Sequence, residues 1–82
     1  MEQITLDHRY IKAVRLARSK TIKQFSEYMG VDSSTISRLE NEKIDFTMFY
    51  ESKLRNAINK LRISNSELLA IKKVIEFQHR GR

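Results

Sequence analysis

The chain has 82 residues with no cysteine and no proline, and 40% of its residues are hydrophobic, which suffices for one small domain. The absence of cysteine excludes a disulfide framework and a thiolate metal site. No apolar run is long enough to span a membrane, and the stretch MEQITLDHRY lacks a signal-peptide hydrophobic region, so we expect a cytoplasmic protein. The net charge of +6 favours a polyanionic partner such as nucleic acid, although the positive charge is spread along the chain.

The first half of the chain carries the signals of two short helices. One is predicted to begin at the N-cap Asp7, with Leu6 placed to pack on Ile11. The next is predicted to begin at the N-cap Thr21 and to end at Gly30, because glycine accommodates the left-handed backbone that closes a helix. The apolar stripes of the two helices contain Ile11, Val14 and Ala17, and Ile22, Phe25 and Met29.

Three more helices are predicted after Gly30. The third is capped by Asp32 and runs from Ser33 to about Asn41, and the fourth begins near Asp45 or Thr47. The fourth helix buries Phe49, Leu54, Ala57, Ile58 and Leu61. SNSE has the spacing of a capping box between Ser64 and Glu67, so a fifth helix is predicted over about 66–78, followed by a basic tail at 79–82. These elements predict an all-α fold, a compact bundle of five short helices in one domain over 1–82.

The third helix presents two different faces. At 100° per residue, Ile36 and Leu39 point inward. The outward face is formed by Ser33, Ser34, Ser37 and Arg38. Short hydroxyl side chains let a helix lie close to a partner surface, and arginine suits phosphate oxygens or the O6 and N7 edge of guanine. A short helix, a glycine-containing turn and a second helix form a helix-turn-helix, predicted here over about 21–41.

IKAVRLARSKTIKQFSEYMGVDSSTISRLENEK, residues 11–43, resembles the Xre-type helix-turn-helix family, which includes phage repressor and Cro-like proteins. LRISNSELL continues the likeness at the junction of the fourth and fifth helices. The resemblance implies a lambda-repressor-like DNA-binding domain and a sequence-specific transcriptional regulator that binds double-stranded DNA. It places the base-reading residues at Ser33, Ser34, Ser37 and Arg38. Phosphate contacts are expected from Thr21, Lys20, Lys23, Thr35, Asn41 and Lys43. Arg15 and Glu40 match a pair that often forms a structural salt bridge in this family.

The chain departs from the family pattern at three positions. Ile22 stands where glutamine usually begins the second helix and contacts phosphate, and Lys20 replaces an apolar residue. Glu42 replaces the glycine that commonly follows Asn41, so we expect Asn41 to take the left-handed conformation that closes the third helix. Glu42 also brings a negative charge close to the presumed DNA surface.

The remaining patterns predict neither catalysis nor metal binding. No Ser–His–acid arrangement, carboxylate pair in an apolar setting or glycine-rich phosphate loop stands out, so we expect no enzymatic activity and no cofactor. His8 and His79 lie far apart without a nearby cysteine, so we also expect no metal site.

The fifth helix has more apolar circumference than a surface helix needs to bury. Its surplus predicts a homodimer on an inverted repeat, with Leu69, Val74, Ile75 and Phe77 at the interface. An alternative reading is a protein-interaction module, such as an antirepressor or antitoxin, whose last helix binds a protein partner. A further alternative is architectural DNA binding with little sequence preference.

Overall fold

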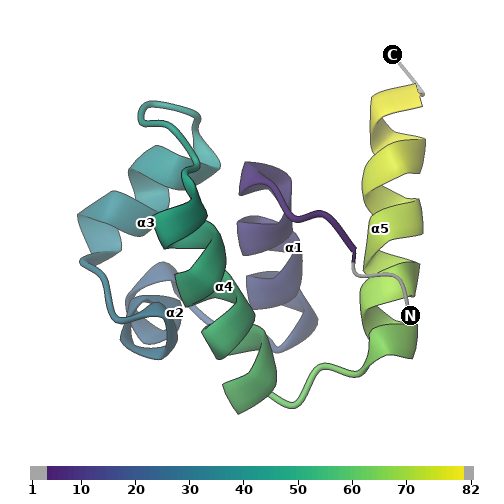
Figure 1. The fold of residues 1–82 in the computed structure, drawn as a ribbon, viewed down its shortest axis with the longest axis horizontal. Coiled ribbons are helices and arrows are strands. Elements are labelled where there is room, and N and C mark those ends of the chain that lie inside the picture. The colour runs from purple at the N-terminus through teal and green to yellow at the C-terminus, as the bar shows by residue number, and fades with distance from the viewer. Residues whose placement is uncertain (1–3, 81–82) are drawn as a thin grey trace.

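The computed structural model describes residues 4–80, and all of their regular structure is helical. The helices are α1 (His8–Ala17), α2 (Ile22–Met29), α3 (Ser33–Glu40), α4 (Met48–Lys60) and α5 (Asn65–Arg80) (Figure 1). The predicted all-α fold with five helices is therefore confirmed. Helix α5 continues through residues 79 and 80, where a tail was predicted, and residues 81–82 of that tail lie outside the described residues.

Local hydrogen bonds explain where the helices begin. Asp7 caps α1 by accepting from the backbone N–H of Arg9 at 2.9 Å. Thr21 caps α2 in a reciprocal capping box with Gln24. Ser64 makes the predicted capping box with Glu67 through bonds of 3.1 and 3.2 Å, so α5 begins one residue before the predicted Ser66. Asp32 occupies the predicted N-cap position of α3, but its side chain makes no capping hydrogen bond.

Helix α2 ends at Gly30, whose φ of 70° is the left-handed conformation expected of a glycine there. Helix α3 ends differently from the prediction, because Asn41 has φ −99° and Glu42 takes the left-handed conformation at φ 57°. Asn41 is held in place by its backbone and side-chain N–H groups, which both bond to the Ser37 carbonyl. The N–H of Lys43 then reaches the Arg38 carbonyl at 2.7 Å, which completes a Schellman-type closure around Glu42. Ser19 and Arg62 adopt the same conformation after α1 and α4.

The core draws side chains from all five helices. Its most deeply buried members are Ile11, Val14, Phe25, Met29, Ile36, Leu39 and Leu54. Phe49 was predicted to join the buried face of α4, and this is wrong, because 60% of its surface is exposed. Helix α4 begins only at Met48, so Phe49 lies in the first turn, where its ring packs edge-on against Tyr50 beneath the Lys53 ammonium.

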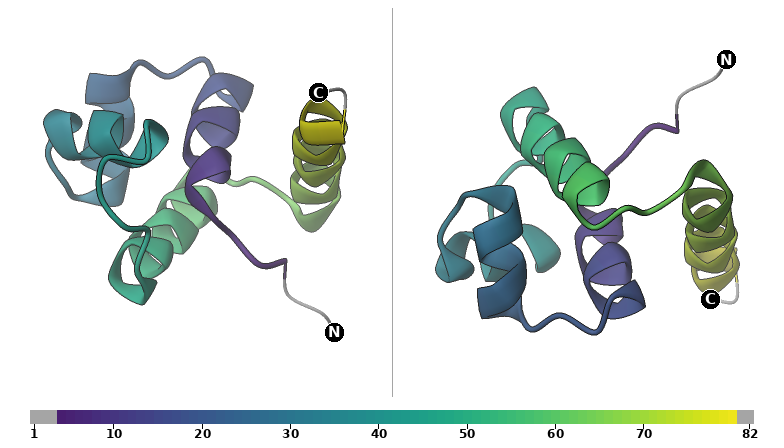
Figure 2. Two further views of the ribbon diagram at one scale, coloured as in Figure 1. Left: turned by 90° about the horizontal axis from the view of Figure 1, so that it is seen from above. Right: turned by 90° about the horizontal axis from the view of Figure 1, so that it is seen from below.

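Helix α5 stands beside α1 at the edge of the molecule (Figure 2). Leu68 and Ile75 anchor it in the core. At the start of α5, Glu67 binds the guanidinium of Arg18 at 2.7 and 2.8 Å, and Arg18 also donates to the carbonyls of Leu61 and Arg62. The hydrogen bonds that Arg18 donates to the Glu67 carboxylate lower the pKa of Glu67 to about 2, with a further contribution from the Ser64 backbone N–H. The contact joins the end of α1 to the beginning of α5.

Candidate nucleic-acid interface

Helices α2 and α3 form the predicted helix-turn-helix, with Gly30 and Val31 at the turn. Phe25 and Met29 of α2 and Ile36 and Leu39 of α3 are all buried in the core. Because both helices are anchored by large apolar side chains, the angle between them is fixed by packing. The outer side of α3 is therefore held in a defined orientation.

The outer side of α3 carries the predicted base-reading residues together. Ser33, Ser34 and Arg38 are exposed, and Ser37 is half-buried. Asn41, at the end of the helix, continues the same face and is exposed. The face is short, polar and narrow, as a helix that enters a DNA groove requires.

Arg38 differs from four other arginines of this chain in having no carboxylate partner. Arg9, Arg15, Arg18 and Arg55 each bind a carboxylate. In the part of the chain that the structure describes, no carboxylate lies within ion-pair distance of the Arg38 guanidinium, which is exposed to solvent. Its five N–H donors are available to an external partner.

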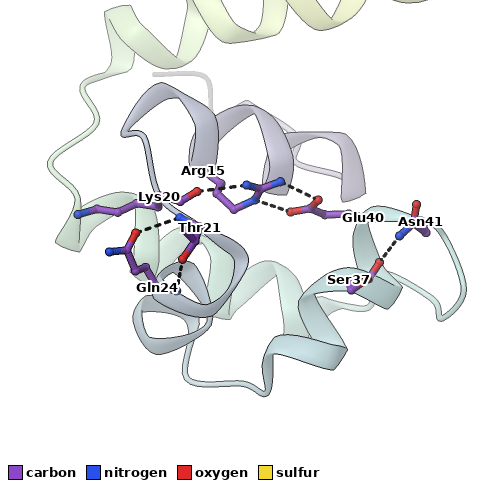
Figure 3. Close-up of polar contacts among 7 residues, drawn as sticks. All are labelled: Arg15, Lys20, Thr21, Gln24, Ser37, Glu40 and Asn41. Carbon is purple, nitrogen blue, oxygen red and sulfur yellow. Dashed lines mark hydrogen bonds and ion pairs between the residues drawn. The ribbon is translucent and has the colours of Figure 1, made fainter.

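The salt bridge implied by the resemblance is present between α1 and α3 (Figure 3). Arg15 donates from Nε and Nη2 to the two carboxylate oxygens of Glu40, at 2.9 and 3.1 Å. Its Nη1 donates to the Lys20 carbonyl at 3.1 Å, so the same side chain also holds the loop before α2. The two side chains are only 11% and 8% exposed, and a bidentate pair at that depth fixes orientation as well as contact.

The residues predicted to contact phosphates lie around the two helices and differ in their exposure to solvent. Thr21 and Lys23 are exposed at the start of α2, and Lys43 is exposed after α3. The Lys20 ammonium lies 5.4 Å from the centre of the Tyr28 ring, and Thr35 is half-buried. Exposed cations thus lie at both ends of the helix-turn-helix, and the exposed hydroxyl of Thr21 lies at its beginning.

The sequence interpretation missed Gln24. Its Oε1 accepts from the Thr21 N–H at 3.0 Å, while the Gln24 N–H donates to Thr21 Oγ1 at 3.0 Å (Figure 3). The exposed amide N–H₂ of Gln24 is left at the start of α2, close to where the family glutamine is replaced by Ile22. The signal was the Thr-x-x-Gln spacing of a capping box, the same type of pattern that identified Ser64 and Glu67.

Glu42 is an acidic neighbour of this surface. Its carboxylate lies 3.1 Å from Nε2 of His8 at the beginning of α1. The Glu42 side chain is 69% exposed, so the contact holds the carboxylate near α1 without burying it. The negative charge expected near the DNA surface is thus partly directed toward α1.

The predicted dimer residues do not all lie on the surface. Leu69, Val74 and Phe77 are exposed, but Ile75 is only 4% exposed and belongs to the core. Its side chain contacts the interior because Leu68 and Ile75 share one face of α5. An interface on α5 must therefore use the exposed residues, and Ile75 is excluded from it.

No group of three or more His, Asp or Glu side chains within the described residues could hold a metal ion. Within the same residues no helix is both long and apolar enough to cross a bilayer. A family model described as Helix-turn-helix matches residues 11–60, more than half of the chain. Neither the curated proteins nor the solved structures contain a significant match. With the turn, the buried apolar positions and the Arg15–Glu40 pair in place, the chain belongs to the Xre/Cro-like helix-turn-helix family of DNA-binding transcription regulators.

Proposed function

We propose that the protein is a sequence-specific transcriptional repressor that binds an inverted-repeat operator as a homodimer. The observation that carries the proposal is the outer side of α3, where Ser33, Ser34, Ser37 and the unpaired Arg38 are exposed or half-exposed on a rigidly anchored helix. A repressor needs no more than occupancy of the promoter, which DNA binding alone supplies.

The two parts of the surface have different tasks in this proposal. The α3 face enters the major groove, where Arg38 reads a guanine and the serine hydroxyls adjust to neighbouring base edges. Lys20, Lys23, Thr21, Asn41 and Lys43 approach the phosphates and position the helix, and Thr35 borders the same surface. Gln24 adds an amide donor at the start of α2. Phosphate contacts make the affinity fall as salt concentration rises, whereas the groove contacts provide discrimination between sequences.

In vitro selection from a random duplex library tests the proposal. We expect one inverted repeat to be enriched, and Arg38→Ala to lose roughly 1–3 kcal/mol of discrimination at one base pair in each half-site. Arg62→Ala is a matched control, because Arg62 is an exposed arginine on the link between α4 and α5. That link lies on the side of the molecule away from α3 (Figure 1). The control should keep the preference of the wild type.

Three outcomes would contradict parts of the proposal. Uniform weakening of Arg38→Ala on all sequences would assign Arg38 to a phosphate. Equal affinity of the wild type for all duplexes would indicate architectural binding, and an enriched single half-site would indicate a monomer.

The exposed apolar side chains of α5 favour one second candidate, a protein-interaction module on the same scaffold. Such a module would bind a protein partner through Val74 and Phe77 while its contact with DNA stayed weak. A stable complex with a defined partner, together with no protected DNA in a footprint, would support this candidate over the repressor.

A further inference from the structure

Glu42 lies between two residues that the proposed function brings to the phosphates. Asn41 precedes it and Lys43 follows it, and all three residues are exposed. The backbone of Glu42 is left-handed at φ 57°, and the N–H of Lys43 is fixed on the Arg38 carbonyl at 2.7 Å. The chain therefore places a carboxylate at the edge of the surface that approaches DNA, where phosphates repel it.

His8, the first residue of α1, meets this carboxylate. Its Nε2 lies 3.1 Å from a carboxylate oxygen of Glu42, and its side chain is 26% exposed, against 69% for Glu42. A neutral imidazole with its proton on Nε2 donates a hydrogen bond to this oxygen, whereas an imidazolium also offsets the charge of the carboxylate. The contact thus draws the carboxylate toward α1 and makes the net charge of the pair depend on one proton.

The other carboxylates near His8 on α1 and α3 already have arginine partners. Two ion pairs hold them, Asp7 with Arg9 and Glu40 with Arg15. Lys12 lies one turn further along α1, and within the described residues no carboxylate lies at ion-pair distance from it. Because Asp7 and Glu40 are paired, Glu42 is the carboxylate whose charge a proton on His8 offsets.

Helix α5 brings no competing charge to this contact. His8 and Glu42 line a groove between α1 and α5. The α5 residues that line the same groove are all uncharged, namely Ala70, Ile71, Val74, Ile75 and Gln78. The Glu76 carboxylate of α5 acts electrostatically on Arg9 and Tyr10 and does not line the groove. The charge at this edge of the DNA surface is therefore controlled by His8 and Glu42 themselves.

We propose that His8 is a positioning residue of the DNA-binding surface, which holds the Glu42 carboxylate toward α1 and neutralises it when protonated. The inference rests on the proposed DNA binding and adds a dependence on pH. Histidine side chains change charge between about pH 5 and 8. Phosphates beside the surface favour the protonated pair over a negatively charged one, so DNA binding takes up a proton. By linkage, a proton on His8 then strengthens DNA binding by the same factor, and the affinity rises as the pH falls.

Coulomb's law gives the size of the effect. For a phosphate about 7 Å from the carboxylate in water, removal of the repulsion corresponds to about a threefold change in affinity. A homodimer carries the pair twice, so the expected change is about threefold on one half-site and about tenfold on an inverted repeat. Salt screens the repulsion, so the effect should be largest at low ionic strength.

Fluorescence anisotropy of a labelled duplex titrated with the full chain, from about pH 7.5 to about pH 5.5 at low salt, tests the proposal. The probes are the duplex enriched by selection and a scrambled duplex of the same composition. We expect the affinity of the wild type for the enriched duplex to rise about tenfold over this range. His8→Gln should lose most of the rise. His79→Gln is the matched control, because the chain has two histidines, and it should keep the rise.

Glu42→Gln distinguishes the pair from a positive charge that acts alone. This variant lacks the repelling carboxylate, so near pH 7.5 it should bind about threefold more tightly per half-site than the wild type. The difference should narrow as the pH falls, because the wild-type carboxylate is then neutralised by His8. Calorimetry in buffers of different ionisation enthalpy should show proton uptake on DNA binding by the wild type and a smaller uptake by both variants. Circular dichroism of every variant checks that the helical fold is retained.

The outcomes separate this inference from the proposed function. A wild-type affinity that is independent of pH, or a full rise in His8→Gln, would overturn the role of His8 while leaving DNA binding intact. A full rise in Glu42→Gln would show that His8 acts on the phosphates directly, which overturns the role of the pair. A wild type that binds neither duplex at any pH would overturn the proposed function and this inference together.

Discussion

The ion pair of Arg15 with Glu40 provides the sharpest test of what holds α3 in position. Glu40→Ala removes the acceptor of two of the three hydrogen bonds that Arg15 makes and leaves only the Lys20 carbonyl. Because Arg15 is 11% exposed, its charge stays largely buried without a carboxylate. Loss of one member of such a pair destabilises a protein by about 3–5 kcal/mol. Two charge-assisted hydrogen bonds at about 1.5–3 kcal/mol each give a similar magnitude.

Urea denaturation followed by circular dichroism measures this change as a free energy of unfolding. A loss of this size is a large part of the stability of a small domain, which lies near the low end of about 5–15 kcal/mol. Glu51→Ala is a matched control, because Glu51 binds Arg55 in a half-exposed pair four residues apart on α4. That pair should contribute less than about 1 kcal/mol.

A second variant distinguishes an unpaired charge from lost packing. Replacing both partners, as in Arg15→Met with Glu40→Leu, removes the buried charge altogether and should be less destabilising than Glu40→Ala alone. If the free energy of unfolding of Glu40→Ala lies within about 1 kcal/mol of the wild-type value, the pair does not stabilise the packing of α1 on α3. If the double variant is less stable than Glu40→Ala, the electrostatic explanation fails.

Three further predictions concern helix ends and pH. Thr21→Ala should lower the free energy of unfolding in urea by about 1 kcal/mol, because it breaks the α2 capping box. Thr21→Ser keeps a hydroxyl at the cap and should unfold with the wild-type free energy. Equal stability of the two variants would show that the cap is unimportant. Arg62→Gly and Glu42→Gly should each raise the free energy of unfolding in urea by roughly 0.5–1 kcal/mol, because glycine adopts the left-handed backbone conformation without strain. The gain should be smaller for Glu42→Gly, because that variant also loses the contact with His8. Because the pKa of Glu67 is lowered from 4.5 to about 2, its contribution to stability is complete above pH 4.5 and lost as the pH falls toward 2. Thermal unfolding of Glu67→Gln should therefore differ from wild type at pH 7 and approach it near pH 2, and a gap independent of pH would contradict this linkage.

The positions of the helices could be predicted from the sequence because the deciding interactions are local. Asp7, Thr21 and Ser64 reach backbone N–H groups no more than three residues ahead, and Gly30 closes α2 through its own backbone freedom. The periodic apolar residues likewise placed Ile36 and Leu39 inside and the serine-rich side of α3 outside. These signals lie within one or two helical turns, so no knowledge of the fold is needed to interpret them.

The end of α3 was predicted wrongly because two neighbouring residues could both close the helix. Asn41 and Glu42 could each close α3, and the choice depended on the hydrogen bonds of Asn41 to Ser37 and of Lys43 to Arg38. Phe49 is apolar at helical spacing, yet no helix covers the first turn of α4 sufficiently to bury it. Gln24 carries its own capping signal, the Thr-x-x-Gln spacing from Thr21, and it lies two residues after Ile22, where the family pattern has a glutamine.

By itself, the sequence determined five helices, a helix-turn-helix, and a third helix with one apolar and one polar side. Only the tertiary structure decided that Arg38 is unpaired while Arg15 and Arg18 are bound to carboxylates, and that Ile75 is buried while Val74 and Phe77 are exposed. The physical reason is that helix caps and periodicity depend on near neighbours. Burial, ion pairing and grooves depend instead on which helices meet, and residues as far apart as Arg18 and Glu67 come together only when the chain has folded.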